Sequence, residues 1–137
     1  MSTLNHYRDK AYSIAKAHGF HEAPIENIGE KLMLVVSELG EALEADRKGS
    51  KANLEFFKER LEQLNNSHNG ELTEEVRNEN FNKVFKTYIK DTFEDEIADS
   101  IIRLFDLCGS LGIDLETHVG LKMKYNEGRG YKHGKLY

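Results

Sequence analysis

The chain has 137 residues, of which 39% are hydrophobic and 31% are charged, and its net charge at pH 7 is −5. This length suits a single domain over residues 1–137, and a negative net charge gives no general reason to bind nucleic acid. No apolar run approaches the roughly 18 residues that a membrane span needs, and the single cysteine, Cys108, cannot form an internal disulfide, so we expect a protein of the reducing cytoplasm that binds no membrane.

Helix signals dominate the chain from its first residues. Apolar side chains recur at spacings of three and four, and proline occurs once. A first helix is expected over about Thr3–His18, where Gly19 ends it, and a second over about Ile28–Lys48, where Gly49 ends it. The pattern predicts an all-α fold, a bundle of helices.

Residues 50–91 are predicted to form an inserted helical hairpin. Apolar residues recur at helical spacing over 54–64 and again over 81–89, and the polar stretch at 65–80 between them is expected to be an exposed loop. A further helix is expected over 92–111. It is expected to bury its apolar stripe, which consists of Phe93, Ile97, Ile101, Leu104, Leu107, Cys108 and Leu111.

The last predicted helix starts at Asp114, a suitable N-cap, and ends near Asn126. A basic C-terminal tail at 128–137 follows it. From Leu121 onward the chain has five basic side chains against one acidic side chain, so the acidic charge belongs to the preceding part. This distribution fits either a metal and phosphate site or a tail that forms ion pairs with its own domain.

Two of the predicted helices each carry a pair of carboxylates three residues apart. Glu38 and Glu41 lie on one face of the second helix beside its apolar stripe, whereas Glu44 falls on the outer face; Glu96 and Asp99 repeat the spacing in the helix over 92–111. Four close carboxylates repel one another unless a cation compensates, and hard divalent cations take oxygen ligands. The alternative is that the acids are solvated or favour the helix dipole, and so short a motif does not decide between the two.

The tail offers groups that suit phosphate oxygens. Lys122, Asn126 and Arg129 follow one another at helical or near-helical spacing and supply an ammonium, an amide and a guanidinium. The alternative interpretation is an ordinary basic helix end that binds its own carbonyls. A second possible ligand pair, His18 and His21, lacks further partners and is expected to lie on the surface.

Three motifs in this order, "SELGEALEA", "EIAD" and "LKMKYNEGRGYKHGK", resemble those of the all-α nucleoside triphosphate pyrophosphohydrolases of the MazG-like group. The resemblance implies a helical bundle of the all-α NTP pyrophosphatase type, completed as a homodimer or homotetramer. It also implies hydrolysis of an NTP or dNTP to the monophosphate and pyrophosphate with Mg²⁺, for which Mn²⁺ substitutes. The metal ligands that it implies are Glu38, Glu41, Glu96 and Asp99, and the phosphate-binding residues are Lys122, Asn126 and Arg129.

The implied mechanism uses a carboxylate as general base, and Glu41 is our choice for it. The chain departs from the family pattern in two places: the segment between Glu41 and Glu96 is longer than in compact members, and Gly130 stands where relatives often have proline. Two alternatives stay open. One is phosphoribosyl-ATP pyrophosphohydrolase, a relative with similar acidic helices, and the other is a non-catalytic helical module for oligomerisation or regulation.

Overall fold

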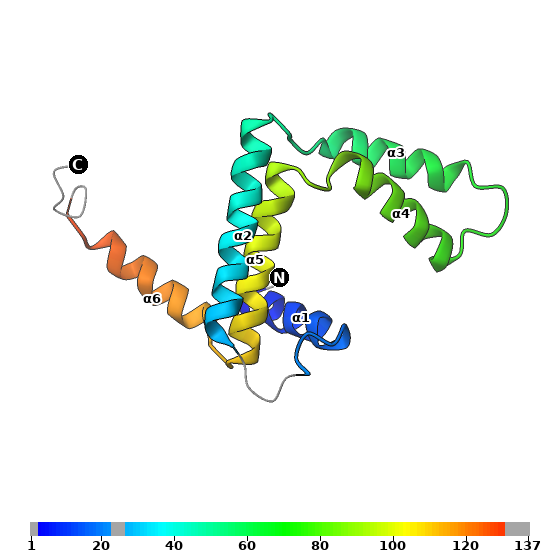
Figure 1. Cartoon of the computed structure of the whole chain (residues 1–137). Coiled ribbons are helices and arrows are strands. Elements are labelled where there is room, and N and C mark those ends of the chain that lie inside the picture. Colours follow the sequence, from blue (N-terminus) through cyan, green and yellow to red (C-terminus); the bar gives the residue numbers. More distant parts are fainter. Residues whose placement is uncertain (1–2, 23–26, 131–137) are drawn as a thin grey trace. The chain divides into compact units, whose positions relative to one another are not determined.

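The computed structural model describes residues 3–22 and 27–130. In these ranges the chain forms helices joined by turns and loops, with no strand, so the prediction of an all-α fold is confirmed (Figure 1). None of the described helices combines the length and the apolar character that crossing a membrane requires. In chain order the helices are α1 (Leu4–Ala17), α2 (Ile28–Arg47), α3 (Leu54–Asn66), α4 (Glu74–Tyr88), α5 (Phe93–Ser110) and α6 (Leu115–Glu127).

Side-chain caps explain where several helices begin. Thr3, Asn53, Thr73 and Asp114 precede α1, α3, α4 and α6, and each accepts a hydrogen bond from the backbone N–H three residues further on. Such a bond satisfies one of the N–H groups that the first turn of a helix leaves without a partner. The predicted bounds of α1, α2, α5 and α6 agree with the structure to within one residue.

The prediction of an exposed loop over 65–80 is wrong for its second half. Residues 74–80 belong to α4, because Thr73 caps this helix and Glu74 and Glu75 lie in its first turn, where acidic side chains interact favourably with the helix dipole. This stretch is polar because α4 has few buried positions. Polar composition also predicts a loop, and for this reason the prediction is wrong here.

The chain divides into two compact units. The first, here called the terminal unit, comprises Met1–Lys31 and Ile102–Tyr137; the second, here called the hairpin unit, comprises Leu32–Ile101. Helices α2 and α5 contribute residues to both. That residues 1–137 behave as one domain stays a prediction.

In the terminal unit, α1 packs against α6 through polar contacts at their first turns. The backbone N–H of Leu4 donates to Glu116 Oε2 at 2.9 Å, and Asn5 Nδ2 donates to Asp114 Oδ1 at 2.7 Å. The same unit has a close approach between α1 and α5 at Gly109, where a Cβ atom would lie 2.5 Å from Cβ of Tyr12. Any side chain at this position would therefore force Tyr12 or the two helices to shift.

The prediction that both histidines lie on the surface is wrong for His21. Its side chain is only 6% exposed, its Nε2 lies 2.6 Å from Asp106 Oδ1, and the ring of Tyr12 packs edge-on against it. Lys31 Nζ contacts the other oxygen of Asp106 at 3.0 Å. A polar cluster that spacing alone does not reveal thus joins the segment after α1 to α5, whereas His18 is exposed.

In the hairpin unit, α3 and α4 form the expected helical hairpin. An aromatic array holds them together: Phe57 of α3 meets Phe81 of α4 edge-to-face at 5.6 Å between ring centroids, and Phe81 stacks on Phe85 at 5.8 Å. Asn80 Nδ2 also donates to Asn65 Oδ1 at 2.9 Å. Such aromatic pairs stabilise beyond the burial of their area.

The hairpin joins the rest of its unit through a neck of four hydrogen bonds between the segments 50–53 and 88–94. They are Asn53 N to Tyr88 O (3.1 Å), Phe93 N to Ser50 O (3.1 Å), Ala52 N to Glu94 Oε2 (2.8 Å) and Ser50 Oγ to Asp91 O (3.3 Å). The neck brings the end of α2 beside the start of α5, and the two helices run antiparallel from there (Figure 1).

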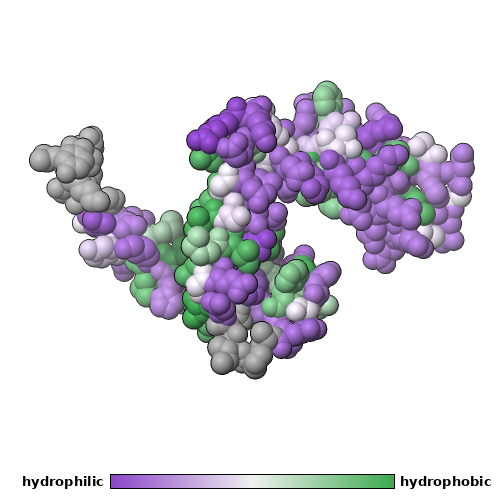
Figure 2. Space-filling view, in the orientation of Figure 1, coloured by the Kyte–Doolittle hydropathy of each residue, from purple (hydrophilic) through white to green (hydrophobic). Residues whose placement is uncertain are grey.

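The apolar stripe of α2 is divided between a buried and an exposed edge. Small residues occupy the buried edge, namely Val35, Ala42 and Ala45, while Val36 and Leu43 are 54% and 50% exposed. Figure 2 shows hydrophobic side chains gathered over α2, in contrast to the mainly hydrophilic surface of α3 and α4. The prediction that α5 buries its whole stripe is wrong, because no second layer of the described chain covers Ile101, Leu104 and Leu111, which are exposed.

Candidate functional site

Acidic side chains occupy core-facing positions in the hairpin unit. On α2 the buried positions are 35, 38, 42 and 45, which follow the spacing of one helix face, and Glu38 takes one of them at 7% exposure. At the start of α5 the buried residues are Thr92, which directly precedes the helix, Glu96 and Ser100, so this face is polar, and Glu96 is 6% exposed. Acids are seldom this buried unless they are paired.

The structure brings three of the four predicted metal ligands together. Glu38, Glu41 and Glu96 each offer a carboxylate oxygen, and these oxygens lie within 4.8 Å of one another. Oxygens on opposite sides of a six-coordinate Mg²⁺ are about 4.2 Å apart, since each Mg–O distance is about 2.1 Å. An all-oxygen set at this separation therefore fits a hard divalent cation after small side-chain movements. Asp99, the fourth predicted ligand, is exposed and lines the same cleft.

The surroundings of Glu96 disfavour its negative charge. Burial raises the pKa of the Glu96 carboxyl above its ordinary value, and the charges of Glu41, Asp95, Asp99 and Glu38 raise it further. Both effects penalise the ionised form in the absence of a cation. A divalent cation would reverse the penalty, because it stabilises the ionised carboxylates that hold it.

A cleft of about 420 Å³ lies beside the acids, and its other side comes from the hairpin. Asn82, Phe85 and Lys86 of α4 line it, together with Lys90 just after that helix. The sequence prediction assigned no function to these four residues. A signal was present: Asn82 and Lys86 are four residues apart on one helix face, in the stretch of sequence that leads directly into the acids of α5. The cleft is completed by Glu38, Glu41, Asp91, Asp95, Glu96 and Asp99.

The predicted phosphate-binding residues belong to the terminal unit, whereas the acids belong to the hairpin unit. Lys122 and Asn126 are one helical turn apart on α6, and Arg129 follows the helix. Lys122 Nζ lies 5.0 Å from the centre of the Tyr125 ring, and the Arg129 guanidinium carbon lies 5.8 Å from it. All are exposed. The part of the basic tail at 131–137, with the "HGK" of the third motif, lies outside the described residues.

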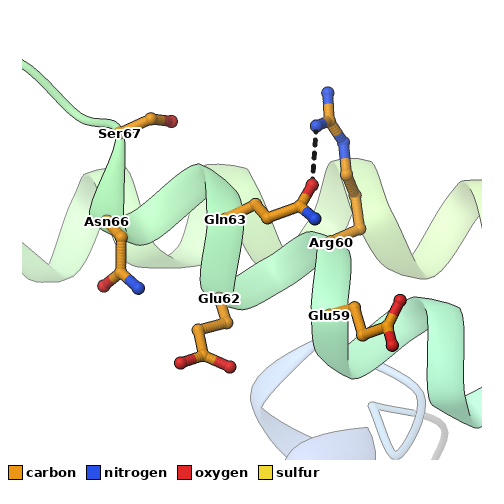
Figure 3. Close-up of a pocket in the computed structure, with 6 residues that line it drawn as sticks. All are labelled: Glu59, Arg60, Glu62, Gln63, Asn66 and Ser67. Atoms are coloured by element: carbon orange, nitrogen blue, oxygen red, sulfur yellow. Dashed lines mark hydrogen bonds between the residues drawn. The ribbon is translucent and has the colours of Figure 1, made fainter.

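A second depression, of about 630 Å³, lies on the hairpin and lacks the features of a site. Its lining side chains all come from α3 or the residue after it, and they point away from the helix in different directions (Figure 3). A hydrogen bond from Arg60 Nη1 to Gln63 Oε1 at 3.2 Å is drawn among them. We interpret it as the solvated face of α3. Glu44 is likewise a surface residue, as expected, and pairs with Arg47 at 2.6 Å.

Comparison with models of protein families, with curated proteins and with solved structures gives no match to the chain. The functional argument therefore depends on the geometry of the acids and the cleft.

Proposed function

We propose that this chain is a Mg²⁺-dependent nucleoside triphosphate pyrophosphohydrolase of the MazG-like type, which converts an NTP or dNTP to the monophosphate and pyrophosphate. The observation that supports it most directly is the convergence of Glu38, Glu41 and Glu96 from two helices, with two of the three buried. Buried carboxylates of like charge are costly to keep together without a cation. The adjoining cleft supplies room for a ligand.

Glu38, Glu41, Glu96 and Asp99 would hold the cation, and Mn²⁺ would substitute for Mg²⁺ there. When bound, the metal neutralises charge on the triphosphate and makes water a stronger nucleophile at neutral pH. Glu41, an exposed member of the group, accepts the proton of the attacking water.

The water oxygen forms a bond to the α-phosphorus, the bond from that phosphorus to the α,β-bridging oxygen breaks, and pyrophosphate leaves with the electron pair. Lys122, Asn126 and Arg129 bind phosphate oxygens in this proposal, since their donors suit them. The exposed apolar edge of α2 supports a homodimer or homotetramer, because association would cover it. The proposed location is the cytoplasm.

The test is pyrophosphate release from a panel of NTPs and dNTPs, with phosphoribosyl-ATP included, in Mg²⁺ and in EDTA. Release in Mg²⁺ alone is expected, and Glu38→Gln should lower turnover by at least about 100-fold because it removes a buried ligand. Glu44→Gln, an exposed change on the same helix, is the control and should retain activity.

Pyrophosphate release from phosphoribosyl-ATP but from no NTP or dNTP would make phosphoribosyl-ATP the substrate. No release from any compound by folded protein would instead assign the acids to a non-catalytic helical module.

A further inference from the structure

One wall of the cleft beside the acids is a single face of α4. Asn82, Phe85 and Lys86 are spaced by three and four residues, which places them on one side of the helix, and all three line the cleft. Lys90 continues this wall toward α5. The cleft is thus lined by acids together with two ammonium groups, an amide and an aromatic ring.

The two lysines differ in their surroundings. Lys90 Nζ lies 2.7 Å from Asp91 Oδ1. The hydrogen bond and charge of Asp91, with smaller contributions from Asp95 and Glu96, raise the pKa of Lys90. Lys86, by contrast, makes no side-chain hydrogen bond or ion pair with any residue in the described part of the chain. Its ammonium group is available to a negatively charged ligand in the cleft.

The groups of this wall lie at different distances along the chain from the acids of α5. Lys90 is closest in sequence to the acids of α5, Lys86 comes one turn earlier, and Asn82 lies another turn away, about 6 Å along the helix axis. Phe85 is half-buried at the end of the aromatic array that begins at Phe57. A ligand that binds the acids and the lysines through a phosphate chain would extend past the ring of Phe85, which adjoins Lys86, toward the amide of Asn82.

We propose, on the basis of the proposed function, that this face of α4 is the wall that recognises the nucleoside triphosphate: Lys86 and Lys90 bind phosphate oxygens, and Asn82 and Phe85 contact the nucleoside. An ammonium group binds phosphate as a point charge, an amide has donors and acceptors for a base or sugar, and an aromatic face stacks on any base. The hairpin then determines which nucleotide enters, while α2 and α5 carry the metal chemistry.

Phosphate recognition is tested with inorganic tripolyphosphate, a probe that has no base or sugar. Its affinity in Mg²⁺ is measured by calorimetry for wild type, Lys86→Gln and Lys83→Gln. Lys83 is an exposed lysine of α4 that does not line the cleft, so it is a matched control. Lys86→Gln should weaken binding by about 10-fold, as expected for one charge-assisted hydrogen bond, and Lys83→Gln should change it little.

Nucleoside recognition is tested with a dNTP panel whose α,β-bridge is a non-hydrolysable imido group. Asn82→Ala should leave the affinity for tripolyphosphate unchanged and weaken binding of the preferred dNTP analogue by about 10-fold. The affinities for the analogues of the four bases should then differ less than they do in wild type. Equal effects on both probes would contradict the assignment of Asn82.

The outcomes separate this inference from the proposal on which it rests. Wild type that turns over nucleotides, with Lys86→Gln and Lys83→Gln indistinguishable in tripolyphosphate affinity, overturns the α4 wall alone. If Lys86→Gln alters the affinity for Mg²⁺ but not that for tripolyphosphate, Lys86 acts by balancing the charge of the acids. This result also overturns the proposal for the α4 wall. Wild type that binds neither tripolyphosphate nor any dNTP analogue overturns both.

Discussion

At the scale of single residues, Glu38 of α2 and Glu96 of α5 occupy buried positions, where apolar side chains are usual. Glu96 is the clearest case, since burial and four neighbouring acids disfavour its charge. We predict that Glu96→Gln raises the unfolding temperature of the protein in EDTA. We also predict that Mg²⁺ raises the unfolding temperature of wild type but not that of the variant. Thermal unfolding of both proteins with and without Mg²⁺ measures this. A variant less stable than wild type in EDTA would mean that the carboxylate has a stabilising partner.

Gly109 provides a second prediction at this scale. A Cβ atom there would meet Tyr12 Cβ at 2.5 Å and Arg8 O at 3.2 Å, so Gly109→Ala should force α1 away from α5 and destabilise the protein by about 1–3 kcal/mol. Gly120 of α6 is the control, because no atom lies within 4 Å of the position that a Cβ atom would take there. Gly120→Ala should stabilise by about 0.5–1 kcal/mol through helix propensity. Urea denaturation of the two variants compares them; a stable Gly109→Ala protein would show that the crossing adapts.

At the scale of helices, sequence reasoning located most ends but did not determine what each helix faces. Gly19, with φ of +80°, and the cap at Asp114 end and begin helices by local chemistry, which the sequence displays directly. Burial depends on which helices pack against each other, which spacing does not determine. The sequence therefore predicts a buried Ile101 and an exposed His21, and both predictions are wrong. The carboxylate pairs follow from spacing along each helix, so the sequence predicts them. A role for Lys86 depends on the packing of α4 beside the acids, and the structure is needed to show that Lys86 lines the cleft.

The N-cap of α6 makes the stability of the protein depend on pH. Hydrogen bonds from Asn5 and Thr117 lower the pKa of Asp114 to about 2 from an ordinary value of 3.8. A lowered pKa means that the charged carboxylate stabilises the fold fully above pH 3.8 and that this stabilisation is lost as pH falls toward 2. Asp114→Asn keeps a capping oxygen without the charge.

We therefore expect wild type to unfold at a higher temperature than Asp114→Asn at neutral pH, and the gap to close between pH 3.8 and about 2. Thermal unfolding of the two proteins across this range measures the gap. A gap that is independent of pH would assign the effect of Asp114 to hydrogen-bond geometry alone.

At the scale of the whole molecule, the described part of one chain leaves the apolar edge of α2 exposed. Val36 and Leu43 are both at least half exposed and lie on one helix face. We predict that wild type has two or four times the 15.7 kDa mass of one chain in light scattering and that the double change Val36→Lys with Leu43→Lys reduces it to that of one chain. Leu54→Lys, at an exposed apolar position on α3, is the control and should retain the oligomer. Wild type that is monomeric at micromolar concentration contradicts the prediction.

The neck of the hairpin has a consequence for how such a protein can diverge. Because the backbone of Asn53 is hydrogen-bonded to that of Tyr88, the chain leaves and re-enters the pair of acidic helices at neighbouring points. A segment attached in this way can be lengthened, shortened or exchanged by insertion and deletion while the helices that it joins keep their register. In the proposed enzyme, exchange of the hairpin would change the residues that line the cleft while the acids of α2 and α5 keep their places.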